Sequence, residues 1–295
     1  MPFLTPVTRT VVHGTTGDDT FNFSPSLSGA SNQYPLGVEY FSNGGNDHVT
    51  GSFHNDVFVL NSGVETINGN GGSDTVDYSN SYGGVVVNLR ELTQHGGWAE
   101  GDQLTNISNV TGSNFDDNLY AKAGGSVING LGGNDFIGTS LGNDTVDGGA
   151  GNDIIAGALG GTDVLTGGSG KDTFIFGVMN HDFNVTITDF NPLISVNQHP
   201  TDSQLIADPV HDVLELSFLP QSGVTGDAGA NAALQMTLGS DGQMHPFAIS
   251  GHDVVLTIHT PDVDGTITLK GLADLLPDNQ HSFTVIDHAV TGGAN

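Results

Sequence analysis

From Gly112 to Ile175 the chain reads GSNFDDNLY, AKAGGSVIN, GLGGNDFIG, TSLGNDTVD, GGAGNDIIA, GALGGTDVLT and GGSGKDTFI, so the same unit returns every nine residues, with one residue added in the sixth. A shorter array from Ser42 to Asp77 reads SNGGNDHVT, GSFHNDVFV, LNSGVETIN and GNGGSDTVD, and an isolated unit, GTTGDDTFN, covers Gly14 to Asn22. A fixed short period is the signature of a protein built from one stacked supersecondary unit.

Written as G-G-x-G-x-D-x-U-x, the unit has an apolar residue at U in all twelve copies and an acidic residue two positions earlier in eleven of them, Ser126 being the exception. The x-U-x segment predicts a very short strand with one inward side chain. The glycine-rich half predicts a turn that needs positive φ. Two units then make one coil, and successive coils stack their strands in parallel.

Such a coil buries only a thin apolar line, which is too little to offset the ordering of so many glycines. A carboxylate at every turn, among free backbone carbonyls, forms the all-oxygen site that Ca²⁺ prefers. Asp and Gly are also common in ordinary turns, but ordinary turns have no reason to recur every nine residues. We therefore expect Ca²⁺ as cofactor. The expected ligand residues are Asp19, Asp47, Asp56, Asp74, Asp117, Asp135, Asp144, Asp153, Asp163 and Asp172, with turn residues Gly44, Gly72, Gly130, Gly132, Gly133, Gly148, Gly149, Gly151, Gly167, Gly168 and Gly170.

Units such as GGAGNDIIA and GLGGNDFIG resemble the repeats-in-toxin (RTX) nonapeptide of hemolysin-type calcium-binding proteins. The resemblance implies an all-β fold, a right-handed parallel β-roll with a β-rich C-terminal cap, and ions held between stacked turns. The expected organisation is an N-terminal segment (1–41), a first array (42–77), a spacer (78–111), a second array (112–175) and the cap (176–295). The spacer resembles one that recurs between RTX arrays, with a strand at Val85 to Leu89 and Asp102 to Val110 leading into the next array.

Because the partner turn lies two units away, the acidic positions can be paired. Asp117, Asp135, Asp153 and Asp172 form one series, and Asp56 pairs with Asp74. Weaker sites are expected where Ser126 faces Asp144, where the extra residue separates Asp144 from Asp163, and where Asp47 faces Glu65. We expect three to five well-occupied ions.

After Ile175 the period ends. Strands are expected at Thr173 to Val178, Val185 to Phe190, Val213 to Phe218, Leu234 to Leu238, Val254 to His259, Thr266 to Leu269 and Phe283 to Ile286, with a short helix at Leu272 to Leu276. The phrases DTFIF, VTITDF, DVLEL and DGTITLKGL resemble the region that follows the repeats in type I secreted proteins. That resemblance implies an uncleaved export signal, at roughly Lys270 to Asn295, a type I secretion apparatus as partner, and a Gram-negative bacterium.

The composition excludes several classes of protein. A net charge of -28 argues against binding to nucleic acid or an anionic membrane surface. The absence of Cys removes disulfides and thiol catalysis, and 44 glycines argue against a largely helical fold. No run of about 18 apolar residues predicts a membrane span, and Met1 to Val12 lacks the features of a cleavable signal peptide.

No catalytic motif is found: H-E-x-x-H is absent, and the G-x-S-x-G string at Gly138 to Gly142 straddles two repeats. We therefore expect a secreted, non-enzymatic calcium-binding protein that acts through its surface in a matrix, in adhesion or in host interaction, with polysaccharide or protein as partner. The alternative is a secreted hydrolase with an unrecognised site. Eight of the twelve His residues follow Ile175, and a second metal site there is the alternative to solvated surface histidines.

Overall fold

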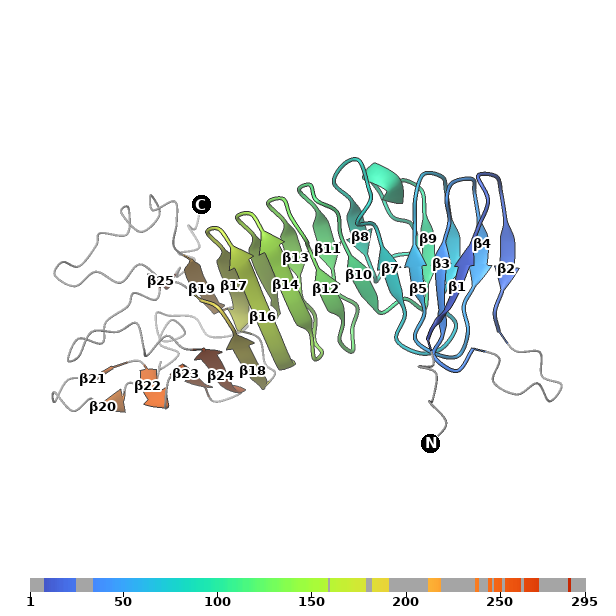
Figure 1. Cartoon of the computed structure of the whole chain (residues 1–295). Coiled ribbons are helices and arrows are strands. Elements are labelled where there is room, and N and C mark those ends of the chain that lie inside the picture. The colour runs from blue at the N-terminus through green and yellow to red at the C-terminus, as the bar shows by residue number, and fades with distance from the viewer. Residues whose placement is uncertain are drawn as a thin grey trace, which may run out of the picture. The chain divides into compact units, whose positions relative to one another are not determined.

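The computed structural model describes residues 8–24, 34–158, 160–178, 182–190, 212–218, 237–238, 244–245, 247–250, 253–260, 263–270 and 286–287. The chain divides into two compact units, residues 1–122 with 126–135 and residues 123–125 with 136–295. In both units nearly all regular structure is β, and most strand pairs are parallel (Figure 1). The prediction of an all-β, β-roll protein is confirmed.

The strands of the first unit are mostly three residues long, as the x-U-x segments predict. They are β1 (Thr10–His13), β2 (Thr20–Asn22), β3 (Val38–Phe41), β4 (His48–Thr50), β5 (Val57–Val59), β6 (Thr66–Asn68), β7 (Thr75–Asp77), β8 (Val86–Asn88), β9 (Gln103–Thr105), β10 (Asn109–Thr111), β11 (Asn118–Tyr120) and β12 (Val127–Asn129).

These strands form parallel ladders in which neighbours are two repeats apart. One ladder runs β1-β3-β5-β7-β10-β12, a second runs β2-β4-β6-β9, and β8 pairs with β11. Within the repeats the register advances by 18 residues, so that Tyr40 faces Phe58 and Phe58 faces Val76. One coil therefore consists of two nonapeptides.

The apolar position of the repeat forms the core. Eleven of the twelve U residues are at most 1% exposed, and Phe21, in the isolated repeat, is half-buried. The spacer continues the stack, because Leu104 of β9 aligns with Ile67 and Val110 of β10 aligns with Val76. The expected strand at Val85 to Leu89 is confirmed as β8, one residue shorter at each end.

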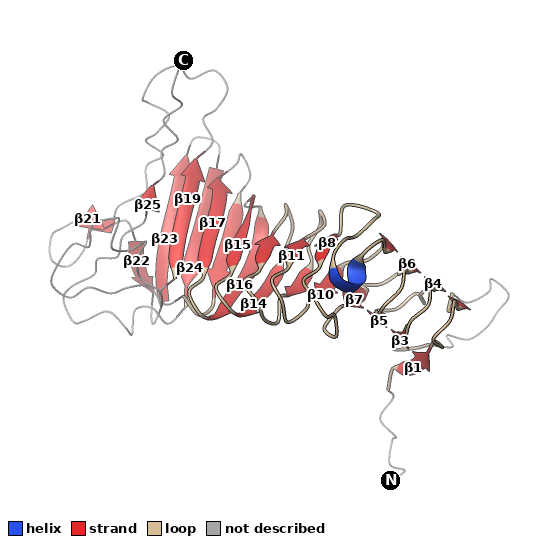
Figure 2. Ribbon diagram, turned by 90° about the horizontal axis from the view of Figure 1, so that it is seen from above, coloured by secondary structure: helices blue, strands red, loops and turns tan. Residues whose placement is uncertain are grey.

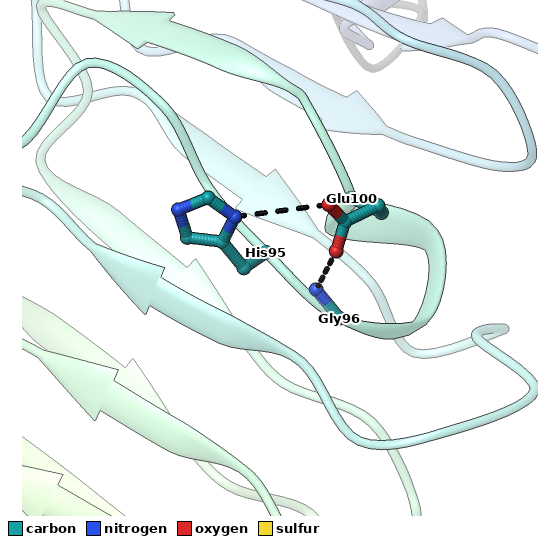
Figure 3. Close-up of polar contacts among 3 residues, drawn as sticks. All are labelled: His95, Gly96 and Glu100. Atoms are coloured by element: carbon teal, nitrogen blue, oxygen red, sulfur yellow. Dashed lines mark hydrogen bonds and ion pairs between the residues drawn. The ribbon is translucent and has the colours of Figure 1, made fainter.

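Between β8 and β9 the spacer makes an excursion that includes the 3-10 helix η1 (Gly97–Ala99). Figure 3 shows its closure: His95 Nδ1 lies 3.8 Å from Glu100 Oε1, and the Gly96 N–H donates to Glu100 Oε2 at 2.9 Å. Antiparallel bridges join Val86 to His95 and Thr93 to Gln103. The excursion thus leaves the stack and returns to it.

The second unit has longer strands (Figure 2). They are β13 (Phe136–Gly138), β14 (Thr145–Ala150), β15 (Ile154–Ala158), β16 (Gly161–Ser169), β17 (Thr173–Val178), β18 (Phe183–Ile187), β19 (Val213–Phe218), β20 (Thr237–Leu238), β21 (Met244–His245), β22 (Phe247–Ser250), β23 (Asp253–Thr260), β24 (Val263–Leu269) and β25 (Ile286–Asp287). One sheet runs β14-β16-β18-β24-β23-β22, a second runs β13-β15-β17-β19-β25, and β20 pairs with β21. Pairing changes from parallel to antiparallel where β24 meets β23.

Strand predictions after the repeats are largely confirmed. The expected strands at 173–178 and 213–218 are β17 and β19, and those at 254–259 and 266–269 lie within β23 and β24. The strand expected at 185–190 is β18, which ends at Ile187 because the chain then turns and the Asp189 carboxylate accepts hydrogen bonds from the N–H groups of Gly167 and Gly168. The helix expected at 272–276, residues 234–236 and residues 283–285 lie outside the described residues.

Candidate calcium-binding turns

Each acidic residue of the repeat lies in the turn directly before a strand, except Asp163, which lies within β16, and all of them but Asp19 are buried. The residues that are at most 2% exposed are Asp47, Asp56, Glu65, Asp74, Asp117, Asp135, Asp144, Asp153, Asp163 and Asp172, whereas Asp19 is half-buried. The chain has only five Lys and Arg residues for 33 Asp and Glu. Buried carboxylates are costly unless they are paired, coordinated or protonated. These turns therefore require protons or added cations.

The carboxylates of successive coils are joined by a ladder of hydrogen bonds. In each step the N–H of an acidic residue donates to Oδ1 of the Asp in the next coil. The steps are Asp19 to Asp47 (3.0 Å), Asp56 to Asp74 (2.8 Å), Glu65 to Asp102 (2.8 Å), Asp117 to Asp135 (2.9 Å), Asp144 to Asp163 (2.9 Å), Asp153 to Asp172 (2.9 Å) and Asp172 to Asp212 (2.9 Å). Four predicted pairs are thus hydrogen-bonded neighbours: Asp56 with Asp74, Asp117 with Asp135, Asp144 with Asp163 and Asp153 with Asp172. The predicted pairs of Asp135 with Asp153 and of Ser126 with Asp144 join residues of different units.

In four turns the second carboxylate oxygen is also satisfied by the protein. The residue four positions before the Asp is Thr15, Ser52, Ser113 or Ser140, and its backbone N–H donates to Oδ2 at 2.5 to 2.8 Å. The hydroxyls of Ser52 and Ser113 also donate to the Oδ1 atoms of Asp56 and Asp117 at 2.8 Å. These Ser and Thr residues were not anticipated, although their spacing of four residues is visible in the sequence.

In the turns of Asp74 and Asp172 the second oxygen has no donor. Oδ2 of each residue is buried and accepts no hydrogen bond. A Cβ added to Gly69 would collide with Asp74 Oδ2 and with the carbonyl oxygen of Asn106, and one added to Gly167 would collide with Asp172 Oδ2. The cradle at Asp74 is lined by a carboxylate and a carbonyl oxygen, and both cradles stay open only because glycine has no side chain.

An oxygen-lined cradle with an unsatisfied carboxylate fits Ca²⁺, which takes six to eight carboxylate and carbonyl oxygens. Among the residues that the structure describes, no three His, Asp or Glu side chains come close enough to hold one ion. Backbone carbonyls must then contribute much of the coordination, which is why the site depends on the glycine-rich turns.

The electrostatics of these turns also favour a cation. Burial first, and then a neighbouring carboxylate, raise the pKa of each of Asp74, Asp163 and Asp172 to about 7. A raised pKa means that the ionised form is disfavoured in the fold. A divalent ion between two such carboxylates removes that penalty, because it replaces repulsion by attraction.

Two columns of turns in the first unit differ in what faces the carboxylates. The first column comprises the positions before β2, β4, β6 and β9, which are Asp19, Asp47, Glu65 and Asp102. The second column comprises the positions before β5, β7, β10 and β12, which are Asp56, Asp74, Ser108 and Ser126.

In the first column tyrosine hydroxyls supply hydrogen bonds. Tyr40 donates to Asp47 Oδ2 at 2.7 Å, and Tyr78 donates to Asp102 Oδ2 at 2.8 Å. Both tyrosines are fully buried. Glu65 is fully buried beside them, and neither of its carboxylate oxygens accepts a hydrogen bond. Burial, and then the carboxylate of Asp102, raises the pKa of Glu65 to about 9.

Sequence reasoning missed several residues that take repeat positions outside the recognised repeats. Asp102 and Asp212 take the acidic position outside the arrays, and Tyr40 takes the apolar position of β3. Asp102 precedes Leu104, and Asp212 precedes Leu214, with the D-x-U spacing of the repeat. The missing glycines hid both acidic residues. The second metal site considered among the C-terminal histidines involves side chains outside those that the structure describes.

A family model described as "RTX calcium-binding nonapeptide repeat" matches this chain in four copies, at residues 41–76, 111–146, 139–161 and 158–178. The chain therefore contains RTX repeats, which are calcium-binding units. No curated protein matches the chain. The R3 subunit of the Azotobacter vinelandii AlgE6 mannuronan C5-epimerase is a similar solved structure, at 24% identity, over 62% of this chain and 89% of that one, with a TM-score of 0.19. Within the described part of the chain no helix is long and apolar enough to cross a membrane.

Proposed function

We propose that this chain is an extracellular protein whose stacked turns bind Ca²⁺ and fold as they do so. The observation that carries the proposal is the buried Oδ2 of Asp74, which has no hydrogen-bond donor and faces a carbonyl oxygen across a cradle that only glycine leaves open. In the second unit, Oδ2 of Asp172 is likewise buried without a donor, beside Gly167.

In this proposal the ligands are the ten Asp carboxylates of the repeats and the carbonyls of their glycine-rich turns. The best sites involve Asp74 and Asp172, whose second oxygens have no donor. Asp47 is a weaker ligand, because Tyr40 already occupies one of its oxygens. Bound Ca²⁺ supplies positive charge and links neighbouring coils through oxygen atoms. The protein holds the coils in register for it through the N–H to Oδ1 ladder.

The proposed site of action is outside the cell, where Ca²⁺ is abundant. A chain that folds only when it binds calcium stays expanded where free calcium is low and folds where it is high. We propose export through a type I apparatus, directed by the C-terminal residues. Deletion of residues 280–295 is expected to retain the protein in the cell. Wild-type amounts of the truncated chain in the medium of intact cells would contradict this route.

The proposed role is exerted through the surface, in a matrix, in adhesion or in host interaction, with polysaccharide or protein as partner. Stacked repeats present extended, repeating surfaces, which suit binding to extended partners. The acidic turns recur along these surfaces at every coil. The role predicts that calcium-loaded protein binds to the surface of the producing cells and that a chelator releases it. Equal binding in chelator would contradict it.

Calcium-dependent folding is tested on the full chain by far-UV circular dichroism and small-angle scattering. In chelator the charge of -28 should keep the chain expanded, and millimolar Ca²⁺ should compact it into β structure. Mg²⁺ should not replace Ca²⁺, since it prefers six near-ideal ligands and keeps its water. An unchanged spectrum and radius in excess chelator would contradict the proposal.

A further inference from the structure

The second column is interrupted where two consecutive acidic positions are serine. Strand register places Val110 opposite Val76 and Ile128 opposite Val110, so Ser108 and Ser126 stand in line with Asp74. Both serines are buried, at 6% and 4% exposure. The repeating turn is therefore kept, but its carboxylates are not. Ca²⁺ sites depend on carboxylate charge, so this gap is a poor calcium site.

A lysine ammonium lies in this gap. Lys122 Nζ donates to Ser108 Oγ at 2.6 Å, and the Lys122 backbone N–H donates to Ser126 Oγ at 3.1 Å. Lys122 stands four residues before Ser126, the position at which Ser52 and Ser113 contact the Asp carboxylates of their own turns. The Lys122 side chain therefore begins at a position that faces the second column, and it extends to Ser108 of the preceding coil.

Lys122 also lies near the acidic residue next in the column. Ser108, whose hydroxyl accepts from Lys122 Nζ, donates its backbone N–H to the carbonyl oxygen of Asp74 at 3.0 Å. The ammonium therefore lies beside the turn that adjoins Asp74, where it can act as a counter-ion.

A second cationic side chain, that of Arg90, donates a hydrogen bond to the same repeat. Arg90 Nε donates to the carbonyl oxygen of Ala121 at 2.7 Å, and Ala121 is the first residue of the repeat that contains Lys122. First-position carbonyls of other repeats, those of Gly69 and Gly167, face the cradles of the preceding coils. Arg90 follows β8 as Lys122 follows β11, and these two strands are paired. Two of the chain's five Lys and Arg residues thus have their hydrogen bonds at the turns that carry serine in place of a carboxylate.

We propose that Lys122 is a tethered cation that takes the place of Ca²⁺ between the coils of β10 and β12, so that this gap holds no ion. The inference rests on the proposed calcium function of the other turns. It identifies Lys122 as the residue that ends the calcium series of the second column after Asp74. The ammonium provides the positive charge and the serine hydroxyls provide neutral oxygen ligands, where Ca²⁺ would need carboxylates.

The first test compares Lys122→Met with Lys122→Arg and with Lys270→Met in the full chain. Lys270 is exposed, so its substitution removes the same charge without touching this gap. In saturating Ca²⁺, Lys122→Met should lower Tm by about 3 to 6 °C, while the other two variants stay within about 1 °C of wild type. Equilibrium dialysis should find the same number of bound ions in all four proteins. A Tm of Lys122→Met equal to that of Lys270→Met, or the loss of an ion, would overturn the inference.

The second test restores the carboxylates. The double substitution Ser108→Asp with Ser126→Asp is made in two chains, one that keeps Lys122 and one that also carries Lys122→Met. The chain with the additional Lys122→Met substitution should bind at least one more Ca²⁺ than the chain that keeps the lysine, because ammonium and calcium exclude each other. Equal ion counts would overturn the inference. The wild-type ion count separates the two proposals. If the wild-type chain binds no Ca²⁺, the proposed function is refuted. If the wild-type chain binds Ca²⁺ and these two variants bind equal numbers of ions, only the role of Lys122 is refuted.

Discussion

The two columns of the first unit both precede strands of parallel ladders but differ in the atoms that face their carboxylates. In the first column the hydroxyls of Tyr40 and Tyr78 donate to Asp47 and Asp102. In the second column the corresponding oxygen of Asp74 has no donor and faces a carbonyl. An acidic residue at the repeat position is thus not sufficient for a calcium site. If a hydrogen-bond donor faces the second carboxylate oxygen, that oxygen accepts a hydrogen bond; if no donor faces it, the oxygen is left to bind an ion.

The largest expected effect comes from removing charge in the second column. Asp74→Asn should lower the calcium count and, in Ca²⁺ at 100 times Kd, reduce the free energy of unfolding by about 2.7 kcal/mol for each site lost. Asp47→Asn should lower the calcium count less than Asp74→Asn does, because Tyr40 already occupies one oxygen of Asp47 and makes it the weaker ligand. Calorimetric titration and thermal melting in Ca²⁺ measure both variants. Equal losses of calcium would mean that the two columns are equivalent.

The next effect comes from removing a donor in the first column. Tyr78→Phe leaves the buried Asp102 without its hydroxyl partner and should destabilise the protein by about 2 kcal/mol. The freed oxygen should then make the first column resemble the second, so the melting temperature of Tyr78→Phe should depend more steeply on Ca²⁺ concentration. Tyr82→Phe is the matched control, since Tyr82 is 71% exposed. Identical calcium dependence in both variants would argue against the comparison.

The columns should also respond differently to pH. The pKa of Glu65 is raised from 4.5 to about 9 and that of Asp74 from 3.8 to about 7, so both groups stabilise the fold when protonated. That contribution is complete below the ordinary pKa values and is lost as the pH rises through about 7 for Asp74 and about 9 for Glu65. Bound Ca²⁺ keeps Asp74 ionised and removes its share of the pH dependence.

In saturating Ca²⁺ the loss of stability between pH 7 and pH 9 should therefore come from the first column. Glu65→Gln should make the stability of the protein less dependent on pH in this range, because the amide carries no titrating proton. Glu91→Gln, at an exposed position, should leave the wild-type profile unchanged. Thermal melting across this pH range measures all three proteins. A Glu65→Gln profile as steep as that of the wild type would show that Glu65 is not the titrating group.

The smallest effect concerns the turn that leads to Asp135. Leu131 has φ of 74°, a left-handed conformation that costs a residue with a side chain about 1 kcal/mol or more. Leu131→Gly should therefore stabilise the calcium-loaded protein by about 1 kcal/mol. Asn70, in the turn before Asp74, has φ of 73°. Asn70→Gly should stabilise the protein less than Leu131→Gly does, because Asn tolerates this conformation. Chemical denaturation in Ca²⁺ compares the two, and destabilisation by Leu131→Gly would contradict the reasoning.

The nine-residue period was enough to predict the parallel stack, the inward apolar residues and the pairing of turns two repeats apart. This is possible because each of these features depends on residues close together in the chain, and the periodicity of side chains along a strand is set by backbone geometry. The strands at 173–178 and 213–218 were predicted for the same reason. Asp102 and Asp212 were missed, since they share the spacing but not the glycines.

Only the folded chain shows which oxygen atoms remain without a donor. Tyr40 stands seven residues before Asp47, Tyr78 stands 24 before Asp102, and Lys122 follows Ser108 by 14. No local pattern relates these positions, because the stacking of coils brings them together. Hydrogen bonds and charges act over a few ångströms in space, whatever the separation along the chain. The repeat therefore establishes where carboxylates lie, and the coil-to-coil contacts decide which of them are left for calcium.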